Sequence, residues 1–387
     1  MSSILDTYAR KPISFIRGEG SFLYKEKEEK YLDWVAGIAT NILGHCHPHV
    51  VKAIQDQSKK LVHVSNAFII KEAESLAKRL TDNTFADKIF FCNSGAESIE
   101  GSIKIVRKYF HSIGKPEKNR ILGMSGAFHG RTLAALFLGN NKSHTEGFGP
   151  KVEGFDQVVF GDHEALKKAI NKNTAAIICE PVQGEGGIKV VPDYCLKGLR
   201  EICDEHGILL ILDCVQTSFR TGTLLGFENS GISPDLCCIA KGFGNGFPIG
   251  AILLTNEVAK GMTHGSHGST FGNNLLACAA AHAVLDVVLE KSFFENVKSK
   301  GKYFDKELKK LKDNFPNIIE EVRGINFIKG LKLKVDVSNF MSKLMDNKLL
   351  VVKAAENCIR LFPSLLSTTE ELDMGIKIIE KTCKEIS

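Results

Sequence analysis

The chain has 387 residues, with 50 Lys and Arg against 45 Asp and Glu, and therefore a formal net charge of +5. This length is too great for one ordinary hydrophobic core and predicts about two domains. Hydrophobic residues make up 43% and charged residues 25%, which excludes a disordered, collagen-like or acidic-tail protein. The small charge is spread along the chain and gives no basis for a nucleic-acid-binding protein.

The sequence also argues against a membrane or secreted protein. No apolar run reaches the roughly 20 residues needed to cross a bilayer. The segment 1–17 contains Asp6 and lacks the apolar core of a signal peptide. The 11 Cys are an odd number, and several lie in apolar stretches, which fits reduced thiols better than a disulfide framework. We therefore expect a cytoplasmic protein with no membrane partner.

The N-terminal half predicts a layered α/β structure. After a small β-structure at 21–24 and 31–34, short apolar runs alternate with helix-like segments from about residue 86 to residue 254. Strands are expected at 88–92, 121–125, 157–160, 174–180, 208–213, 236–240 and 249–254, and helices at 96–110 and 193–206. Near-continuous apolar strands are buried on both faces, so they predict a mainly parallel sheet covered by helices.

After Asn273 the pattern changes to long helices and few strands. Helices are expected at 277–289, 293–315, 337–347 and 370–386, and short strands at 318–322 and 327–333. This order predicts a smaller α+β domain. We expect an N-terminal segment, 1–60, that packs with the small domain, a large domain, 61–290, and a small C-terminal domain, 291–387.

A lysine and an aspartate follow two of the expected strands. Asp213 ends the apolar run 208–212, and Lys241 follows the run 236–240 and begins a glycine-rich stretch. Functional residues of parallel sheets gather at the carboxyl ends of the strands. A lysine amine can form a Schiff base with pyridoxal phosphate, and a carboxylate can keep its pyridinium nitrogen protonated. The alternative is structural, with Lys241 as a charge at a helix entrance and Asp213 as a helix N-cap.

Three further segments have features of ligand-binding loops. The segment 91–98 leads from a strand into a helix, where small residues leave backbone N–H groups free for a phosphate. The loop 268–272 could add hydroxyl donors. The stretch 242–246 resembles a dinucleotide loop only superficially, because it follows a late strand and a lysine precedes it.

A cluster of metal-ligand residue types occurs near the N-terminus: His45, Cys46, His47 and His49. Their spacing is too tight for a closed structural zinc site, and no second ligand pair is evident. A metal role and a structural role in a turn before a helix are both open, and we expect no metal.

Six motifs, in order along the chain, resemble those of class III pyridoxal-phosphate aminotransferases. They are Leu-Gly-His-Cys-His-Pro at 43–48, Asn-Ser-Gly-Ala-Glu at 93–97, Gly-Ala-Phe-His-Gly-Arg-Thr at 126–132, Glu-Pro-Val-Gln-Gly-Glu-Gly-Gly at 180–187, Ala-Lys-Gly-Phe-Gly-Asn-Gly-Phe-Pro-Ile-Gly-Ala at 240–251 and Ile-Arg-Leu-Phe-Pro at 359–363. The resemblance covers nearly the whole chain. It implies an α/β protein with the aspartate-aminotransferase-like fold (fold type I), whose large, mainly parallel sheet domain binds pyridoxal 5'-phosphate.

The resemblance also implies a role for each matching position. Lys241 and Asp213 would be catalytic, the first as Schiff-base lysine and proton carrier, the second as partner of the pyridine nitrogen. The cofactor-binding residues would be Ser94, Gly95 and Ala96 at the phosphate, Val215 and Phe128 on the two ring faces, Gln216 near the phenolic oxygen, and Thr270 at the phosphate of the neighbouring subunit. Substrate would contact Arg131, Glu185, Ser269 and Arg360. Thr270 thereby implies a homodimer with shared active sites.

Within the class, the chain most resembles acetylornithine and ornithine aminotransferases. The implied reaction transfers the distal amine of N-acetylornithine to 2-oxoglutarate, giving N-acetylglutamate semialdehyde and glutamate, a step of arginine biosynthesis. Ornithine, succinyl-diaminopimelate and 4-aminobutyrate are alternative donors, and a weakly catalytic cofactor-binding homologue is a further alternative. The sequence does not decide the acyl group, because small apolar differences in a pocket change binding by only about 1–3 kcal/mol.

Two loops depart from the family pattern. After Asp213 the chain has Cys214 where the family has a glutamate, Ser218 where it has a glycine, and one residue fewer before Arg220. After Phe271, an asparagine stands for a glycine at 273 and a leucine for a proline at 275. We expect the loop 217–222 to be repacked or mobile, so the level of activity is open.

Overall fold

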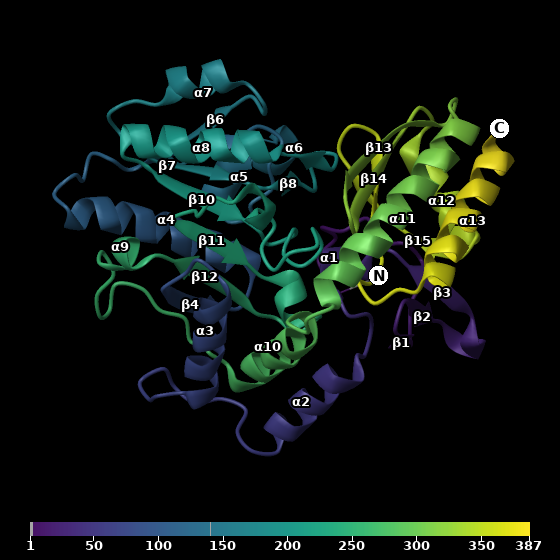
Figure 1. The fold of residues 1–387 in the computed structure, drawn as a ribbon, viewed down its shortest axis with the longest axis horizontal. Helices are drawn as coiled ribbons and strands as arrows, with labels where there is room; N and C mark the ends of the chain where they lie inside the picture. Colours follow the sequence, from purple (N-terminus) through teal and green to yellow (C-terminus); the bar gives the residue numbers. More distant parts are fainter. Residues whose placement is uncertain (1–2, 140) are drawn as a thin grey trace.

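A seven-stranded sheet forms the centre of the larger part of the computed structural model, which describes residues 3–139 and 141–387 (Figure 1). In spatial order its strands are β4 (Lys88–Cys92), β12 (Gly250–Leu254), β11 (Leu236–Ile239), β10 (Leu209–Asp213), β7 (Thr174–Cys179), β5 (Arg120–Met124) and β6 (Phe155–Val158). β12 is antiparallel to both neighbours, whereas the remaining adjacent pairs are parallel. The expected mainly parallel sheet is therefore confirmed.

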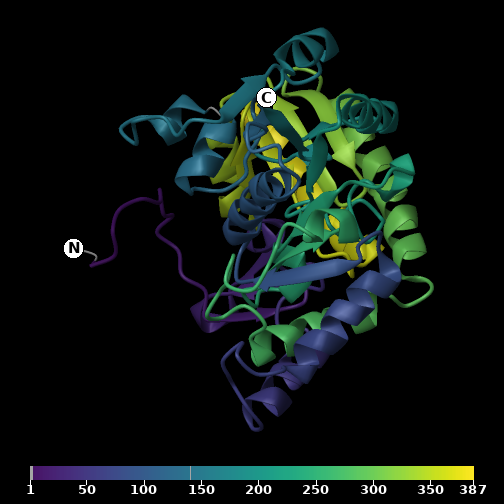
Figure 2. The same cartoon turned by 90° about the vertical axis from the view of Figure 1, so that its left-hand side faces the viewer.

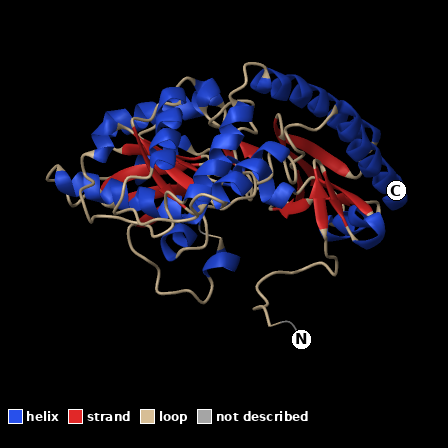
Figure 3. Cartoon of the chain, turned by 90° about the horizontal axis from the view of Figure 1, so that it is seen from below, coloured by secondary structure: helices blue, strands red, loops and turns tan. Residues whose placement is uncertain are grey.

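The central strands are buried on both faces. Along β10, Leu210 and Leu212 belong to one hydrophobic core, and Leu209 and Ile211 belong to a second core. Side chains alternate between the two faces of a strand, so each face contributes to a separate core. Figure 3 shows helices on both sides of the strands. α4 (Gly95–Ser112) packs against β11 and β12, and α8 (Asp193–His206) packs against β10. This double burial explains the continuous apolar runs in the sequence.

Most of the expected elements lie within a few residues of their predicted bounds. The helix expected at 193–206 has those bounds in the structure. The strand expected at 157–160 begins and ends two residues earlier, as β6. Phe155 is almost completely buried against β5, whereas the side chain of Val159 is 62% exposed, so pairing with the sheet favours the earlier register.

The C-terminal part is built on a smaller antiparallel sheet. Its strands, in spatial order, are β13 (Ile319–Ile325), β14 (Ile328–Leu333), β17 (Cys358–Leu361) and β16 (Val352–Ala354). The helices of this part are α11 (Phe293–Asn314), α12 (Val337–Asp346) and α13 (Thr369–Ile386). Figure 1 shows these helices packed together on one side of the molecule. The arrangement agrees with the predicted α+β character.

The N-terminal segment contacts both parts of the chain. β1 (Arg17–Glu19), β2 (Phe22–Tyr24) and β3 (Lys30–Asp33) form one sheet with β15 (Leu349–Leu350). In contrast, α2 (Pro48–Ser58) packs along α10 (Leu275–Val288). The described residues that precede Phe15 extend away from the sheet (Figure 2). The domain limits at residues 60 and 290 stay a prediction.

Shorter elements complete the chain. They are α1 (Ala36–Ala39), α3 (Lys71–Asn83), α5 (Leu133–Gly139), α6 (Lys142–Thr145), α7 (His163–Ala169), β8 (Val182–Gln183), β9 (Lys189–Val190), α9 (Asn256–Ala259), and the 3-10 turns η1 (Glu26–Glu28), η2 (Glu228–Ser230) and η3 (Lys241–Gly244). Among residues 3–139 and 141–387, no helix combines the length and apolar character needed to span a membrane.

Candidate active site

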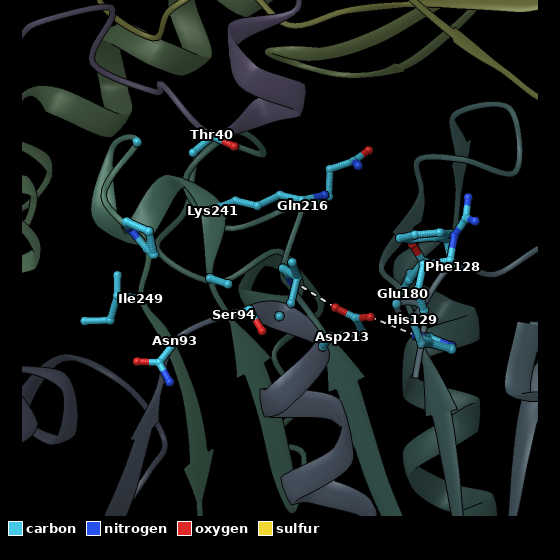
Figure 4. A pocket seen from close by; sticks show the side chains of 18 of the residues that line it. Thr40, Asn93, Ser94, Phe128, His129, Glu180, Asp213, Gln216, Lys241 and Ile249 are labelled. Carbon is cyan, nitrogen blue, oxygen red and sulfur yellow. Dashed lines mark hydrogen bonds and ion pairs between the residues drawn. The ribbon is translucent and has the colours of Figure 1, made fainter. Parts of the chain in front are cut away.

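A cavity of about 460 Å³ opens where β4, β10 and β11 end, at the carboxyl edge of the large sheet (Figure 4). Parallel strands bring their following loops to one edge, so residues far apart in the sequence meet there. Nine of the residues assigned roles from the sequence line it: Ser94, Gly95, Ala96, Phe128, Arg131, Asp213, Val215, Gln216 and Lys241.

The start of α4 forms one end of the cavity. Ser94 is the N-cap, and its side-chain oxygen accepts a hydrogen bond from the backbone N–H of Glu97 at 3.2 Å. The first backbone N–H groups of a helix have no acceptor within the helix. Gly95 lets Val215 approach, because a Cβ atom at residue 95 would lie 2.7 Å from its side chain. The helix start therefore fits a phosphate group at the positive end of the helix dipole.

Asp213 lies on the cavity floor in a fixed hydrogen-bond arrangement. Its Oδ2 atom is 2.7 Å from Nδ1 of His129, and its Oδ1 atom accepts from the backbone N–H of Val215 at 3.0 Å. Burial alone would lower the pKa of His129, but its hydrogen bond to Asp213 and the charges of Asp213 and Glu180 raise it. A protonated His129 would donate this hydrogen bond and orient the carboxylate group that could face a pyridinium nitrogen.

Glu180 was not assigned a role from the sequence, although it begins the motif 180–187. It follows β7, lines the cavity, and accepts a hydrogen bond from the backbone N–H of Phe128 at 3.1 Å. Burial raises the pKa of Glu180 to about 8, against the opposing charge of His129 and with added repulsion from Asp213. Its position directly after a buried strand could have marked Glu180 as a site residue in the sequence. Thr40 also lines the cavity, but it lies outside the six family motifs, and the sequence around it did not identify it.

Lys241 begins η3 with φ +47° and borders the cavity. Although the side chain is partly open to this space, it lies deep in the protein. Loss of solvent, together with the charge of Arg360, lowers the pKa of its amine to about 8, while Asp213, Glu185 and Glu180 act in the opposite direction. An amine with this pKa is partly unprotonated near neutrality and can act as a nucleophile and as a base.

The side chain of Gln216 also fits a bound cofactor, as the start of α4 does. Its Oε1 atom is buried and has no hydrogen-bond partner among the described residues. The side chain lies against Gly184, where a Cβ atom would be 1.6 Å from that oxygen. In Figure 4, Gln216 and Lys241 lie close to each other above the strand ends. An unpartnered amide beside a reactive amine fits a polar ligand such as pyridoxal phosphate.

The remaining substrate-binding candidates lie beside the cavity lining. Nη1 of Arg360 is 2.8 Å from Oε1 of Glu185, as an ion pair. Ser269 accepts hydrogen bonds from Nδ2 of Asn93 at 3.2 Å and from a backbone N–H in its own loop. The neighbouring Thr270 is exposed on the surface of this chain.

The loop that departs from the family pattern lies in the protein interior. Residues 217–221 are almost completely buried. Nη1 of Arg220 donates to the carbonyl oxygens of Pro363 at 2.9 Å and Phe327 at 3.2 Å. Burial lowers the pKa of Arg220 to about 9. The loop is therefore packed in the protein interior, and its expected difference from the family stays a prediction.

The histidines near the N-terminus are used in protein contacts. His45 lies 2.7 Å from a carboxylate oxygen of Asp33, and His49 lies 2.8 Å from Asp286. In the part of the chain that the structure describes, no group of three or more His, Cys, Asp or Glu side chains is arranged to hold a metal ion.

Comparison with known proteins decides the family. The profile described as "Aminotransferase class-III" matches residues 6–383. The chain belongs to the class III aminotransferases. It is 50% identical, over 385 residues, to the acetylornithine aminotransferase of Agrobacterium fabrum, with 99% of this chain and 96% of that protein covered.

Two solved structures are similar to this class III aminotransferase over almost all of its length. The ornithine aminotransferase of Toxoplasma gondii ME49 superposes with a TM-score of 0.95 at 29% identity, covering 99% of this chain and 93% of the other. A PLP-bound amine transaminase from an uncultivated Pseudomonas species has a TM-score of 0.92 at 27% identity, covering 100% and 98%. The fold is thus the fold type I expected from the sequence, and the protein is a pyridoxal-phosphate-dependent aminotransferase.

Proposed function

We propose that this aminotransferase transfers the distal amino group of N-acetylornithine to 2-oxoglutarate, giving N-acetylglutamate semialdehyde and glutamate. The reaction belongs to arginine biosynthesis, and we place it in the cytoplasm. The observation that carries the proposal is the cavity in which Lys241 and the Asp213–His129 pair converge. The identity of 50% to an acetylornithine aminotransferase supports this choice of donor.

Pyridoxal phosphate, when bound, supplies an electron-accepting ring for the charge that develops at the substrate carbon. The start of α4 would hold its phosphate, and Asp213 would face its ring nitrogen. Lys241 would bind the cofactor and move a proton at the substrate carbon, a task suited to an amine with a pKa of about 8. His129 would hold the Asp213 carboxylate in place through their hydrogen bond.

The two substrates make different demands on the same cavity. Arg131 lines it and would bind a substrate carboxylate, because its planar guanidinium suits a bidentate contact. Glutamate presents a second carboxylate next to its reacting amine, whereas the distal amine of the donor has none. We infer that Glu185 pairs with Arg360 while the donor is bound and turns away when glutamate needs Arg360. Ser269 would contribute a further polar contact beside Asn93.

We also propose a homodimer with shared active sites. Thr270 is exposed in this chain and would reach the cofactor phosphate of the neighbouring subunit. Next to it, the side chain of Phe271 is 58% exposed, and Phe68 and Ile69 are similarly exposed. Asn66 ties the two segments together through hydrogen bonds to the loop around Ser269. Exposed apolar groups that lie together mark interaction surfaces.

A panel of amino donors tests the proposal. Purified protein would be assayed with 2-oxoglutarate and, in turn, N-acetylornithine, ornithine, succinyl-diaminopimelate and 4-aminobutyrate. We expect the highest kcat/KM for N-acetylornithine. A higher value for another donor would reassign the substrate, and no turnover with any donor would support the weakly catalytic homologue. Lys241→Ala provides the blank for reactions that do not use the site.

A further inference from the structure

Arg360 is a buried arginine with few polar contacts besides its ion pair with Glu185. Its side chain is 2% exposed. Nη1 is 2.8 Å from Oε1 of Glu185, but the two groups are not aligned as a hydrogen bond. Nη2 donates to the carbonyl oxygen of Lys353 at 2.7 Å, and Nε has no hydrogen-bond partner among the described residues. Departure of Glu185 would leave the guanidinium with one hydrogen-bond acceptor.

The aromatic ring of Phe362 supplies another contact. The guanidinium carbon of Arg360 is 5.8 Å from the ring centroid, and that of Arg220 is 5.3 Å from the same centroid. Phe362 and Arg220 are fully buried. The face of an aromatic ring attracts a cation, and this attraction is greater where water is excluded. The ring therefore stabilises the position of Arg360 independently of Glu185.

Phe362 is itself fixed through the backbone. Its N–H donates to the carbonyl oxygen of Trp34 at 2.8 Å. The carbonyl oxygen of the next residue, Pro363, accepts from Nη1 of Arg220 at 2.9 Å. Within the described residues Arg220 forms no ion pair with a carboxylate. Its hydrogen bonds go to backbone carbonyl groups instead. Arg220 thus holds the backbone at Pro363, directly after Phe362, whereas Arg360 precedes Phe362 by two residues.

We propose that Phe362, fixed by Arg220, is a positioning residue that keeps Arg360 in place for the substrate α-carboxylate when Glu185 turns away. The inference rests on the proposed roles of Glu185 and Arg360. It is specific to glutamate and 2-oxoglutarate, which need Arg360 released from its ion pair. The distal-amine donor leaves that pair closed and does not depend on the ring.

Phe362→Leu tests the inference, because it keeps an apolar side chain and removes the ring. The two half-reactions would be followed separately by single-turnover absorbance of the holoenzyme. We expect the apparent dissociation constant of glutamate to rise about tenfold, or about 1.4 kcal/mol. The maximal rate with glutamate, and both constants with N-acetylornithine, should stay within about twofold. Phe362→Tyr keeps the ring and should restore glutamate binding.

Phe340→Leu is the matched control. Phe340 is as buried as Phe362, lies in α12 of the same part of the chain, and has no cation recorded over its ring among the described residues. Its replacement should lower the thermal midpoint without changing glutamate binding. If Phe362→Leu does not fold, Phe362→Met, which is also apolar and adapts to irregular space, takes its place.

Arg360→Ala separates the two proposals. If Arg360→Ala leaves glutamate binding unchanged, the proposed role of Arg360 is wrong. If Arg360→Ala weakens glutamate binding but Phe362→Leu does not, the positioning role alone is overturned. Equal weakening of both half-reactions by Phe362→Leu overturns it as well. In the Arg360→Ala background, Phe362→Leu should have no further effect on glutamate binding, because the ring acts through Arg360.

Discussion

Nδ1 of His129 lies 2.7 Å from Oδ2 of Asp213, and both side chains are buried at the carboxyl edge of the large sheet. The two residues are 84 positions apart in the chain and come from the loop after β5 and the end of β10. Their pairing leaves Glu180 as a second buried carboxyl group beside the same imidazole. The imidazole of His129 therefore lies near two buried acids: it hydrogen-bonds to Asp213, whereas Glu180 accepts from the backbone N–H of Phe128.

Glu180 should make stability depend on pH. Burial raises its folded-state pKa from 4.5 to about 8. Between these values the folded protein binds more protons than the unfolded chain, so its stability falls as pH rises. We expect the thermal midpoint of the cofactor-free protein to fall relative to Glu180→Gln between about pH 5 and 8. The exposed Glu164→Gln is the control, and parallel curves for wild type and Glu180→Gln would contradict the prediction.

Lys241 should carry the cofactor. Borohydride reduction of the purified protein should fix pyridoxal phosphate covalently to Lys241, and peptide mapping would identify the labelled residue. Lys241→Ala should still bind some cofactor, because the phosphate site at α4 is intact, but should lose turnover. A label on another lysine would show that the assignment is wrong.

Glu185→Ala should separate the two half-reactions. Without its ion pair, Arg360 stays available to glutamate, so the glutamate half-reaction should hold or accelerate. The donor would then meet an unpaired buried charge, whose cost is on the order of 3–5 kcal/mol. Since about 1.4 kcal/mol is tenfold in rate, the donor half-reaction should fall at least about tenfold. Single-turnover absorbance measures both.

Glu356→Ala is the matched control for that experiment. Glu356 also pairs with an arginine, Arg323, at 2.7 Å, but neither of these two residues is assigned a contact with substrate. Its removal should leave the ratio of the two half-reactions unchanged. Equal losses in both half-reactions of Glu185→Ala would identify Glu185 as a structural residue.

Subunit exchange should reveal a shared site. Lys241→Ala chains should be inactive, and Thr270→Ala chains should be impaired in holding the partner's cofactor phosphate. In a heterodimer one site carries both lesions and the other carries neither. Mixing the two variants should therefore restore some activity, measured as turnover with N-acetylornithine. Exchange demonstrated by mass, without recovered activity, would argue against the shared site.

Cys214→Glu should not improve the enzyme. The side chain of Cys214 is fully buried after β10, and the family's glutamate would bring a charge into this position. A buried charge without a matching partner is destabilising. We expect a lower thermal midpoint and no gain in turnover, with the near-isosteric Cys214→Ser as control. A sharp rise in turnover would mean that the shortened loop is unimportant.

The helices and strands and the centre of the site could be predicted from the sequence. Strands such as β7 and β10 are apolar throughout because both of their faces are buried, and this pattern is visible without the structure. Asp213 and Lys241 could be singled out because Asp213 ends such a strand and Lys241 lies two residues after the end of another. Those signals are local, so they depend on neighbouring residues alone.

The tertiary structure decided which side chains meet. The pairing of His129 with Asp213 and the backbone contacts of Arg220 join segments that are distant in the chain. The raised pKa of Glu180 likewise results from burial by several elements together. Such contacts depend on how sheets and helices pack in three dimensions, and a pattern of neighbouring residues carries no information about them.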